Sequence, residues 1–219
     1  TKYFVYDKSD KVVLERDDKD LADGYYLFTK YDALSRPIAK GLLNTTASQS
    51  TLQTAFDAIT TPYEQTGTSL LGYTNQSFPL IYRPLEADTK QVFYYDDYAF
   101  NTDANYSFQS AKAFHAQGLT KGLLTGMLVR NLETNDWYKF LNHYDYKGRI
   151  IQQFSQNHVG GIDRTDYQYR FNGEILKMRM THKKTGANDL VELYEYAYGH
   201  LGKRTAFSHN SKVVAKYEY

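Results

Sequence analysis

The sequence predicts a mainly β protein in which tandem antiparallel β-hairpins form an extended, curved sheet. Three observations lead to this prediction. A short tyrosine–glycine pattern recurs along the chain, with copies about 25 residues apart. Each clear copy follows a run in which aromatic and polar side chains alternate, as expected for a strand with two different faces. Aromatic residues make up 16% of the chain, so large apolar surface is present to be buried. A fixed period of this size is typical of repeat architectures.

The repeated pattern is a tyrosine, three variable residues, a glycine and a charged residue. Clear copies occupy 144–149, 169–174 and 198–203, and weaker copies begin at Tyr6 and Tyr31. The tyrosines step by 25 residues from 6 to 31, by 25 from 144 to 169, and by 29 to the last copy. The predicted structural repeat motif consists of Tyr6, Asp7, Tyr31, Asp32, Arg36, Tyr144, Asp145, Gly148, Arg149, Tyr169, Gly173, Tyr198 and Gly202.

Residues 1–43 hold the first two repeats. Strand-like residues at 3–6 and 12–14 flank a polar turn, which predicts a hairpin. The strand pattern restarts at Tyr25, and Pro37 suits the first residue of the strand after the second turn. The acidic stretch 17–20 is predicted to be a solvated connector and not a metal site, because no regular element positions its carboxylates.

Residues 44–135 interrupt the repeats and contain the one predicted helix, at about 48–60. Ser48 or Ser50 can cap its first turn. Proline at position 62 disfavours helix at the residue before it. The apolar residues that fall on one helical face are Leu52, Ala55, Phe56 and Ile59. The rest is predicted as a loop or irregular hairpin at 67–79, a strand at 92–98, an irregular stretch at 101–126 with turns at its glycines, and a return to the repeats from 127.

Residues 136–219 carry the clearest repeat signal. In 166–171 the aromatic residues alternate with polar ones, which predicts one buried face and one wet face. Asn172-Gly173 follows and favours a type I′ hairpin turn. Glycine after the turn tolerates a positive φ at little cost. Stacked hairpins would bury a shared aromatic stripe. Residues 216–219 are similar to the first half of another repeat, so we expect a piece of a longer polypeptide.

Composition argues against several classes of function. The formal net charge is +1, and no basic patch is visible, so nucleic-acid binding is not predicted. No cysteine is present, and the histidines lack zinc-site spacings. No glycine-rich phosphate loop follows a strand. The chain has no run of 18 apolar residues that would predict a transmembrane helix. We therefore predict no cofactor, no metal and no membrane span.

Two carboxylate pairs, Asp96–Asp97 and Glu192–Glu195, are candidates for the acid–base pair of a glycosidase. A glycosidase needs two carboxyl groups at a defined separation across a cleft. Adjacent residues of a strand point to opposite faces, so Asp96 and Asp97 would not cooperate within a strand. The sequence therefore predicts no enzyme. For the tyrosines, packing within the sheet and stacking on a glycan both remain open.

The repeat residues resemble the YD repeats of RHS-repeat proteins. The pattern of that family is Tyr-Asp followed by two residues and Gly-Arg. Residues 144–149 match it fully, whereas the copy at 31–36 has serine in place of the glycine. The copy at 198–203 lacks the aspartate and the arginine, and the copy at 169–174 keeps only the tyrosine and glycine. The inserted segment, with Tyr94-Tyr95-Asp96-Asp97-Tyr98, looks like the N-terminal part of long bacterial RHS proteins.

The resemblance implies a β-sheet that spirals into a hollow shell, as in Tc toxins, bacterial polymorphic toxins and teneurins. In toxin relatives the shell encloses a variable C-terminal toxic polypeptide, and the repeat itself has a structural role. The chain is then expected to be a non-catalytic segment of a large secreted or cell-surface protein. Its partners would be neighbouring repeats of the same polypeptide and an enclosed C-terminal toxin. The alternative is a surface module that recognises glycans or a partner protein through exposed aromatic residues.

Overall fold

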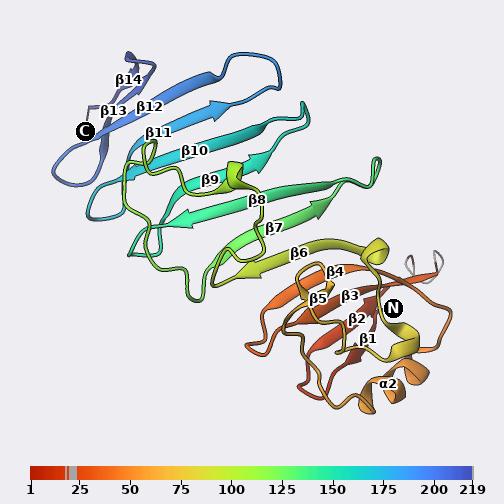
Figure 1. The fold of residues 1–219 in the computed structure, drawn as a ribbon. Coiled ribbons are helices and arrows are strands. Elements are labelled where there is room, and N and C mark those ends of the chain that lie inside the picture. Colours follow the sequence, from red (N-terminus) through yellow and green to blue (C-terminus); the bar gives the residue numbers. More distant parts are fainter. Residues whose placement is uncertain (18, 20–23, 219) are drawn as a thin grey trace. The chain divides into compact units, whose positions relative to one another are not determined.

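The protein, described here from a computed structural model that defines residues 1–17, 19 and 24–218, is built around antiparallel β-strands (Figure 1). Thirteen strands follow one another in the order β1-β2-β3-β4-β6-β7-β8-β9-β10-β11-β12-β13-β14. Among the described residues, β1 and β14 are the two edge strands, so the sheet is not closed. The predicted fold class, a mainly β chain of antiparallel hairpins with one short helix in the inserted segment, is confirmed.

The elements have the following bounds. The helix α2 is Gln49–Asp57, and short 3₁₀ turns lie at Leu80–Tyr82, Glu86–Asp88 and Ala104–Tyr106. The strands are β1 Tyr3–Tyr6, β2 Val12–Arg16, β3 Tyr25–Tyr31, β4 Pro37–Asn44, β5 Thr66–Leu70, β6 Thr89–Tyr95, β7 Leu124–Arg130, β8 Trp137–Tyr144, β9 Ile150–Gln156, β10 Ile162–Tyr169, β11 Ile175–His182, β12 Leu190–Tyr198, β13 Arg204–His209 and β14 Lys212–Lys216.

The contacts divide the chain into two compact units. The first unit comprises residues 1–93 and 128–137, and the second comprises residues 94–127 and 138–219. No helix in the described part of the chain is long and apolar enough to cross a membrane. Each unit combines repeat strands with part of the inserted segment.

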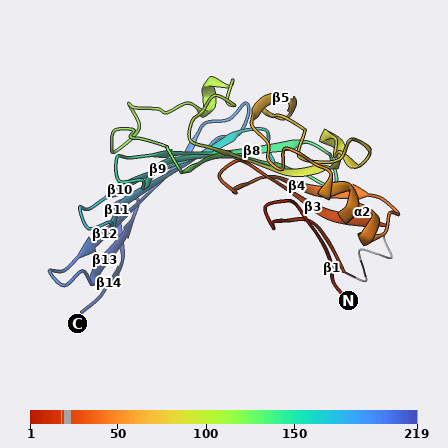
Figure 2. The same ribbon diagram turned by 90° about the horizontal axis from the view of Figure 1, so that it is seen from below.

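In the first unit, α2 and the residues after it cover one face of β1–β4 (Figure 2). Ser48 caps the helix by accepting a hydrogen bond from the Thr51 N–H at 3.2 Å, and Leu52 and Phe56 are buried. The helix ends at Asp57, three residues before its predicted end. Edge-to-face contacts at ring-centre distances of 4.8 and 5.9 Å join Phe56 and Phe28 to Phe78.

In the second unit, the irregular segment 96–123 lies over one face of β8–β11 (Figure 2). Tyr106 of this segment packs with Leu141 and Phe154 in a buried cluster. The alternation predicted in 166–171 is present, but the face that was expected to be wet is the more buried one. Asp166 is fully buried, whereas Tyr167 and Tyr169 are half-buried. The covering segment reverses the expectation, because it lies against the polar face.

The inserted segment differs from the sequence prediction at two further places. The strand predicted at 92–98 ends at Tyr95, since Asp96 adopts a positive φ of 74° that interrupts the strand. Gly126 was predicted in a turn but lies inside β7, where an added Cβ would strike the Phe100 ring. The predicted connector at 17–20 falls partly outside the described residues, which lack positions 18 and 20.

Candidate functional site

The five repeat turns share one backbone geometry. In every copy the second motif residue donates its N–H to the carbonyl of the sixth, and the fifth donates to the carbonyl of the second. The strand register also shifts immediately before each motif tyrosine. These features describe a type I turn followed by a left-handed bulge residue. The residues at that left-handed position are Asp10, Ser35, Gly148, Gly173 and Gly202, with φ between 56° and 95°.

The type I′ turn predicted at Asn172-Gly173 is wrong. A type I′ turn needs positive φ at both central residues, and in this turn only Gly173 has one, at 95°. The Gly173 N–H closes the turn on the Arg170 carbonyl at 3.1 Å, so the central residues of the turn are Phe171 and Asn172, one position earlier than predicted. The motif glycine therefore serves the bulge, where glycine avoids the steric cost of a left-handed conformation.

The motif aspartate caps the turn and pairs with the motif arginine. Asp145 Oδ1 accepts the backbone N–H groups of Lys147 and Arg149 at 2.8 and 3.0 Å, and its Oδ2 accepts from Arg149 Nε at 2.7 Å. Asp32 makes the equivalent bonds to Leu34 and Arg36 at 2.7–2.9 Å. Burial opposes ionisation of Asp145, but the hydrogen bonds from Arg149 and Lys147 outweigh it and hold its pKa below the usual value.

The other copies show what the arginine contributes. In the first copy lysine stands at the arginine position, and Oδ2 of the buried Asp7 has no hydrogen-bond partner among the described residues. In the fourth copy the charges are exchanged, and Arg170 Nη1 bonds Glu174 Oε2 at 2.7 Å. This copy departs from the sequence pattern, yet it keeps an ion pair across the turn.

The motif tyrosine joins each hairpin to the one before it. Its hydroxyl donates to the backbone carbonyl of the first residue of the preceding return strand, over distances of 2.6–2.9 Å. The four pairs are Tyr31 to Val12, Tyr144 to Leu124, Tyr169 to Ile150, and Tyr198 to Ile175. Burial raises the pKa of Tyr169 to about 12, so its hydroxyl stays protonated and remains a donor. The sequence periodicity pointed to these tyrosines but not to their hydrogen-bond partners.

A second contact joins successive hairpins through the charged residue of the turn. The Arg149 guanidinium lies 4.7 Å from the centre of the Tyr169 ring and donates to the Arg170 carbonyl at 2.8 Å. Arg170 lies over Tyr198 at 5.8 Å in the next pair. Such cation–π contacts stabilise by roughly 0.5–1 kcal/mol at exposed sites. In these two pairs the charged residue of one turn therefore holds the tyrosine of the following repeat.

Sequence reasoning missed a row of buried polar residues in the second unit. Register pairs place His143, Gln152, Asp166 and Arg179 side by side across β8–β11. Gln152 Nε2 donates to Asp166 Oδ1 at 2.8 Å, and Arg179 Nε donates to Asp166 Oδ2 at 3.0 Å. Arg164 Nε adds a bond to the same Oδ2 at 3.1 Å. Alternation alone could not reveal this, because it reports two faces without saying which one is covered.

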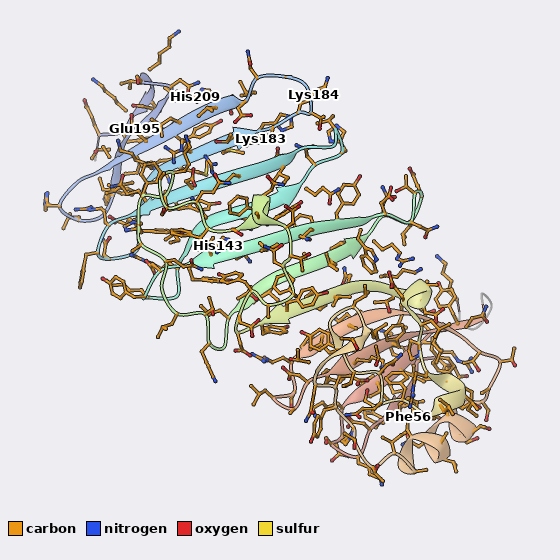
Figure 3. The ribbon with its side chains drawn as sticks, in the orientation of Figure 1. Phe56, His143, Lys183, Lys184, Glu195 and His209 are labelled. Carbon is orange, nitrogen blue, oxygen red and sulfur yellow. The ribbon has the colours of Figure 1, made fainter. Side chains whose placement is uncertain are left out.

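The covering segment 96–123 is attached to that row by its own polar groups. Gln109 exchanges two hydrogen bonds with the Gln152 side chain, at 2.9 and 3.0 Å, and its side chain accepts from Arg164. His143 Nε2 bonds the Tyr106 carbonyl at 2.9 Å, and its Nδ1 meets Gln117 at 3.2 Å. Burial lowers the pKa of His143, which lies on the covered face (Figure 3). We therefore assign the neutral ring with its proton on Nε2.

The first unit holds a fully buried ion pair, which the sequence did not suggest either. Lys30 Nζ donates to Glu64 Oε1 at 2.6 Å, and both side chains are 0% exposed. Burial lowers the pKa of Lys30 to about 8 despite the adjacent carboxylate. Burial works against the Glu64 carboxylate as well, but Lys30 and the hydroxyl and backbone donors of residues 74–77 bring its pKa down to about 2.

The four carboxylates considered as catalytic candidates each form a separate structural contact. Asp96 Oδ1 accepts the Gly122 N–H at 2.6 Å, and Asp97 Oδ1 accepts the Ala99 N–H at 2.9 Å, so both support loops. Glu192 bonds Tyr194, while Glu195 pairs with Lys177. No cluster of three potential metal ligands occurs within residues 1–17, 19 and 24–218.

A cavity of about 260 Å³ lies in the second unit beside the polar row. Lys183 and Lys184 line it, and both are labelled in Figure 3. Arg164 lines it too, but its guanidinium is held by Asp166, Gln109 and Thr181. Lys183 lies 3.9 Å from Asp189. The charged groups at this cavity therefore include two, Arg164 and Lys183, that lie close to carboxylates.

No protein-family profile matches the sequence, and no curated protein matches it. A chain of the Photorhabdus luminescens Tc holotoxin pore matches the structure with 9% identity and a TM-score of 0.24. The match covers 100% of this chain and 14% of that chain. The present chain therefore spans about a seventh of the length of this neighbour.

Proposed function

We propose that the chain is a non-catalytic structural segment of an RHS-type shell or scaffold in a large secreted or cell-surface protein. The single observation that supports this most directly is the repeated staple between hairpins. Four motif tyrosines donate to the first carbonyl of the preceding return strand. These bonds support a role for the motif tyrosines in holding neighbouring hairpins together.

The staple suits a wall that must stay continuous. A single hairpin is marginal in water, and each of the four tyrosines ties its hairpin to a neighbour by a hydrogen bond and by a ring that is at least partly buried. Because every turn repeats the same bonds, hairpins can be added in series without a new design for each junction. Under this proposal the partners are neighbouring repeats of the same polypeptide, and a C-terminal toxin is the enclosed cargo.

Reading the coding sequence on both sides of this stretch tests the proposal. We expect further tyrosine–glycine repeats at intervals of about 25 residues, followed by an unrelated C-terminal segment. Deleting that segment should abolish the toxicity of the whole protein and leave the repeat region folded. A stop codon soon after position 219, with no repeats elsewhere in the gene, would contradict the shell.

A second candidate, glycan or partner binding, rests on one observation. On β12 and β13, Tyr194 stacks on His209 at 4.6 Å and Tyr196 stacks on Phe207 at 5.4 Å. Half-buried rings in a row can stack on sugars as they do on bases. A glycan array separates the two functions. Binding that is lost in Tyr196→Ala but kept in Tyr146→Ala, where the ring is exposed in a turn, would favour the surface module.

A further inference from the structure

We propose that the cavity of the second unit binds a small organic dianion with the chemistry of a phosphate monoester. The cavity has a volume of about 260 Å³, and its lining comes from the covering segment, from β9 and β10, and from the connectors 157–161 and 183–189. Pockets for small molecules usually occupy about 300–1,000 Å³, so the ligand would be small. The site is independent of the proposed structural role, because no residue of the repeat motif lines it.

Positive charge predominates on the side chains that line the cavity. Three cationic side chains and one acidic side chain contribute to the lining, namely Arg164, Lys183, Lys184 and Asp189. The surplus is two positive charges. Behind the lining, Asp166 and Arg179 add one charge of each sign and leave this surplus unchanged. A phosphate ester carries a charge of about −1.5 to −2 at pH 7, so one such group would neutralise the site.

Arg164 is the buried member of this set. Its side chain is 6% exposed. Nε bonds Asp166 at 3.1 Å, Nη1 bonds Gln109, and Nη2 bonds Thr181 at 3.3 Å. A guanidinium has five N–H groups, so one on each terminal nitrogen is still available to a ligand. Asp166 also pairs with Arg179 at 2.9 Å. Because buried charges are normally paired, a cation that shares its carboxylate favours a further anion.

Other donors lie at the same cavity. Gln109 uses its side-chain oxygen to accept from Arg164, and its amide NH₂ has no hydrogen-bond partner among the described residues. The exposed Lys184 ammonium likewise has no partner in the described part of the chain. Lys183 lies 3.9 Å from Asp189 with both side chains nearly half exposed, and such pairs are weak. The cavity therefore offers amide, ammonium and guanidinium donors to the oxygens of an anion.

The two connectors hold one wall of the cavity in place. Asn157 Nδ2 donates to the Lys183 carbonyl at 2.7 Å, and Thr185 Oγ1 donates to the Gly160 carbonyl at 2.9 Å. Gly161 lies so close to the Lys183 carbonyl that an added Cβ would clash with it. These contacts fix the backbone that carries the two lysines without any ligand. A preformed site of this kind loses less conformational freedom on binding.

The apolar part of the lining indicates that the anion has an organic body. Phe154 and Ile162 line the same cavity as the charged groups. Phe154 packs with Tyr106 and Leu141 in the buried cluster, so this part of the wall is held firmly. Inorganic phosphate would leave the apolar surface in contact with water, whereas a monoester with a small ring would cover it. Phenyl phosphate is therefore a suitable probe.

Isothermal titration calorimetry of the whole chain with phenyl phosphate, inorganic phosphate, benzoate and phenol tests the proposal. We expect phenyl phosphate to bind at one site, roughly tenfold more tightly than inorganic phosphate because its ring covers apolar surface. Benzoate, with one charge, should bind more weakly than phenyl phosphate, and phenol should not bind. Added sodium chloride should weaken the binding, because salt screens charges. A chain that binds no anion, or that binds phenol as tightly as phenyl phosphate, would overturn the proposal.

Lys184→Ala tests the location of the site. The side chain is exposed and has no partner in the described chain, so the fold should be unchanged. We expect phenyl phosphate to bind about three- to fivefold more weakly, as for the loss of one exposed ion pair, and Lys184→Glu to weaken it further. The matched control is Lys203→Ala, which removes the same charge from an exposed repeat turn outside the cavity. Equal weakening in the two alanine variants would contradict this location.

Nuclear magnetic resonance gives a test that needs no substitution. On addition of phenyl phosphate, the side-chain NH₂ signals of Gln109 and the Nε–H signal of Arg164 should shift. The side-chain NH₂ signals of Gln153, which bonds Asn142 at 3.0 Å away from the cavity, should stay unchanged. Binding that leaves the Gln109 and Arg164 signals unchanged would place the ligand elsewhere and overturn the proposal.

Discussion

The two units bury charged residues on the covered face of their strands in different ways. In the first unit Lys30 and Glu64 are fully buried, with the lysine over the Phe78 ring and the glutamate bonded by residues 74–77. In the second unit Asp166 is buried between two arginines and a glutamine, and Arg179 keeps 25% of its side chain exposed. Both sets attach an inserted segment to repeat strands. The first attachment has one pair of charges, whose carboxylate also accepts hydrogen bonds from residues 74–77, and the second is a network with three charged members.

The two arrangements should respond differently when one charged residue is replaced by a neutral one. When one member of a single buried ion pair is removed, the remaining charge has no opposite charge beside it. In a network, the remaining charged groups keep other hydrogen-bond and ion-pair partners. The parallel reaches to the repeat itself, because Lys30 and His143 both directly precede a motif tyrosine. The same register position therefore serves two kinds of anchoring, and the inserted segment determines which.

Removing Glu64 should have the largest effect. Glu64→Gln leaves the Lys30 ammonium buried with no anionic partner, and we expect the first unit to lose about 3–5 kcal/mol of unfolding free energy. Trp137, the single tryptophan, lies in the first unit and reports its unfolding by fluorescence in urea. The matched control, Lys30→Met with Glu64→Leu, should recover most of the loss, because replacing both charges with apolar groups is often neutral. A loss below about 1 kcal/mol in Glu64→Gln would show that the pair is not isolated.

Asp166→Asn should have a smaller effect, about 2–3 kcal/mol, because both arginines keep other partners. Arg164 retains Gln109 and Thr181, and Arg179 can turn toward water. Hydrogen exchange should show the loss as lower protection at the Gln109 N–H and along β10, with the first unit unchanged. Asp163→Asn is the control, since that residue lies on the same strand outside the row. Equal losses from Asp166→Asn and Glu64→Gln would remove the contrast between pair and network.

The sequence predicted the parts of the fold that depend on local pattern. Period-two alternation and turn glycines located the hairpins, and Ser48 with Leu52 and Phe56 located the helix. The buried polar row and the Lys30–Glu64 pair could not be predicted, because each depends on which face the inserted segment covers. The ion pair between Arg170 and Glu174 could not be predicted from the sequence motif for a different reason. Its charges are exchanged relative to the motif, although the geometry of the turn is the same.

The turns offer a comparison within the repeats. Gly173 has a φ of 95°, and an added Cβ would meet nothing within 4 Å, so Gly173→Val measures backbone strain without a steric clash. We expect a loss of about 1–2 kcal/mol, the cost of a left-handed conformation for a residue with a side chain. Ser35→Gly should act in the opposite direction, since Ser35 bears this cost at a φ of 68°. Thermal melts should show a lower melting temperature for Gly173→Val and a higher one for Ser35→Gly. An unchanged melting temperature for Gly173→Val would contradict the assigned turn.

The tyrosine staple should contribute less than the turn. Tyr169→Phe keeps the ring and removes only the bond to the Ile150 carbonyl, so we expect about 1 kcal/mol of destabilisation. Tyr31→Phe removes the equivalent bond to Val12 in the first unit and should cost a similar amount. Tyr146→Phe, in an exposed turn position, is the control and should cost nothing measurable. A loss in only one unit would show that the staple depends on the inserted segment above it.

The smallest expected effect is that of acid, which should destabilise the two units at different pH values. His143 has a pKa below its ordinary value of 6.5 in the folded chain because it is buried, so folding favours the neutral ring. Its contribution is present above pH 6.5 and is lost as the pH falls through the folded pKa. Glu64, with a folded pKa of about 2 against an ordinary value of 4.5, loses its contribution only between those two values. Protection factors near Tyr106 and Gln117 should therefore begin to fall once the pH drops below 6.5, while Trp137 fluorescence stays constant until below pH 4.5. His143→Gln should flatten the first change and leave the second, and a Trp137 transition that precedes the loss of protection would contradict this order.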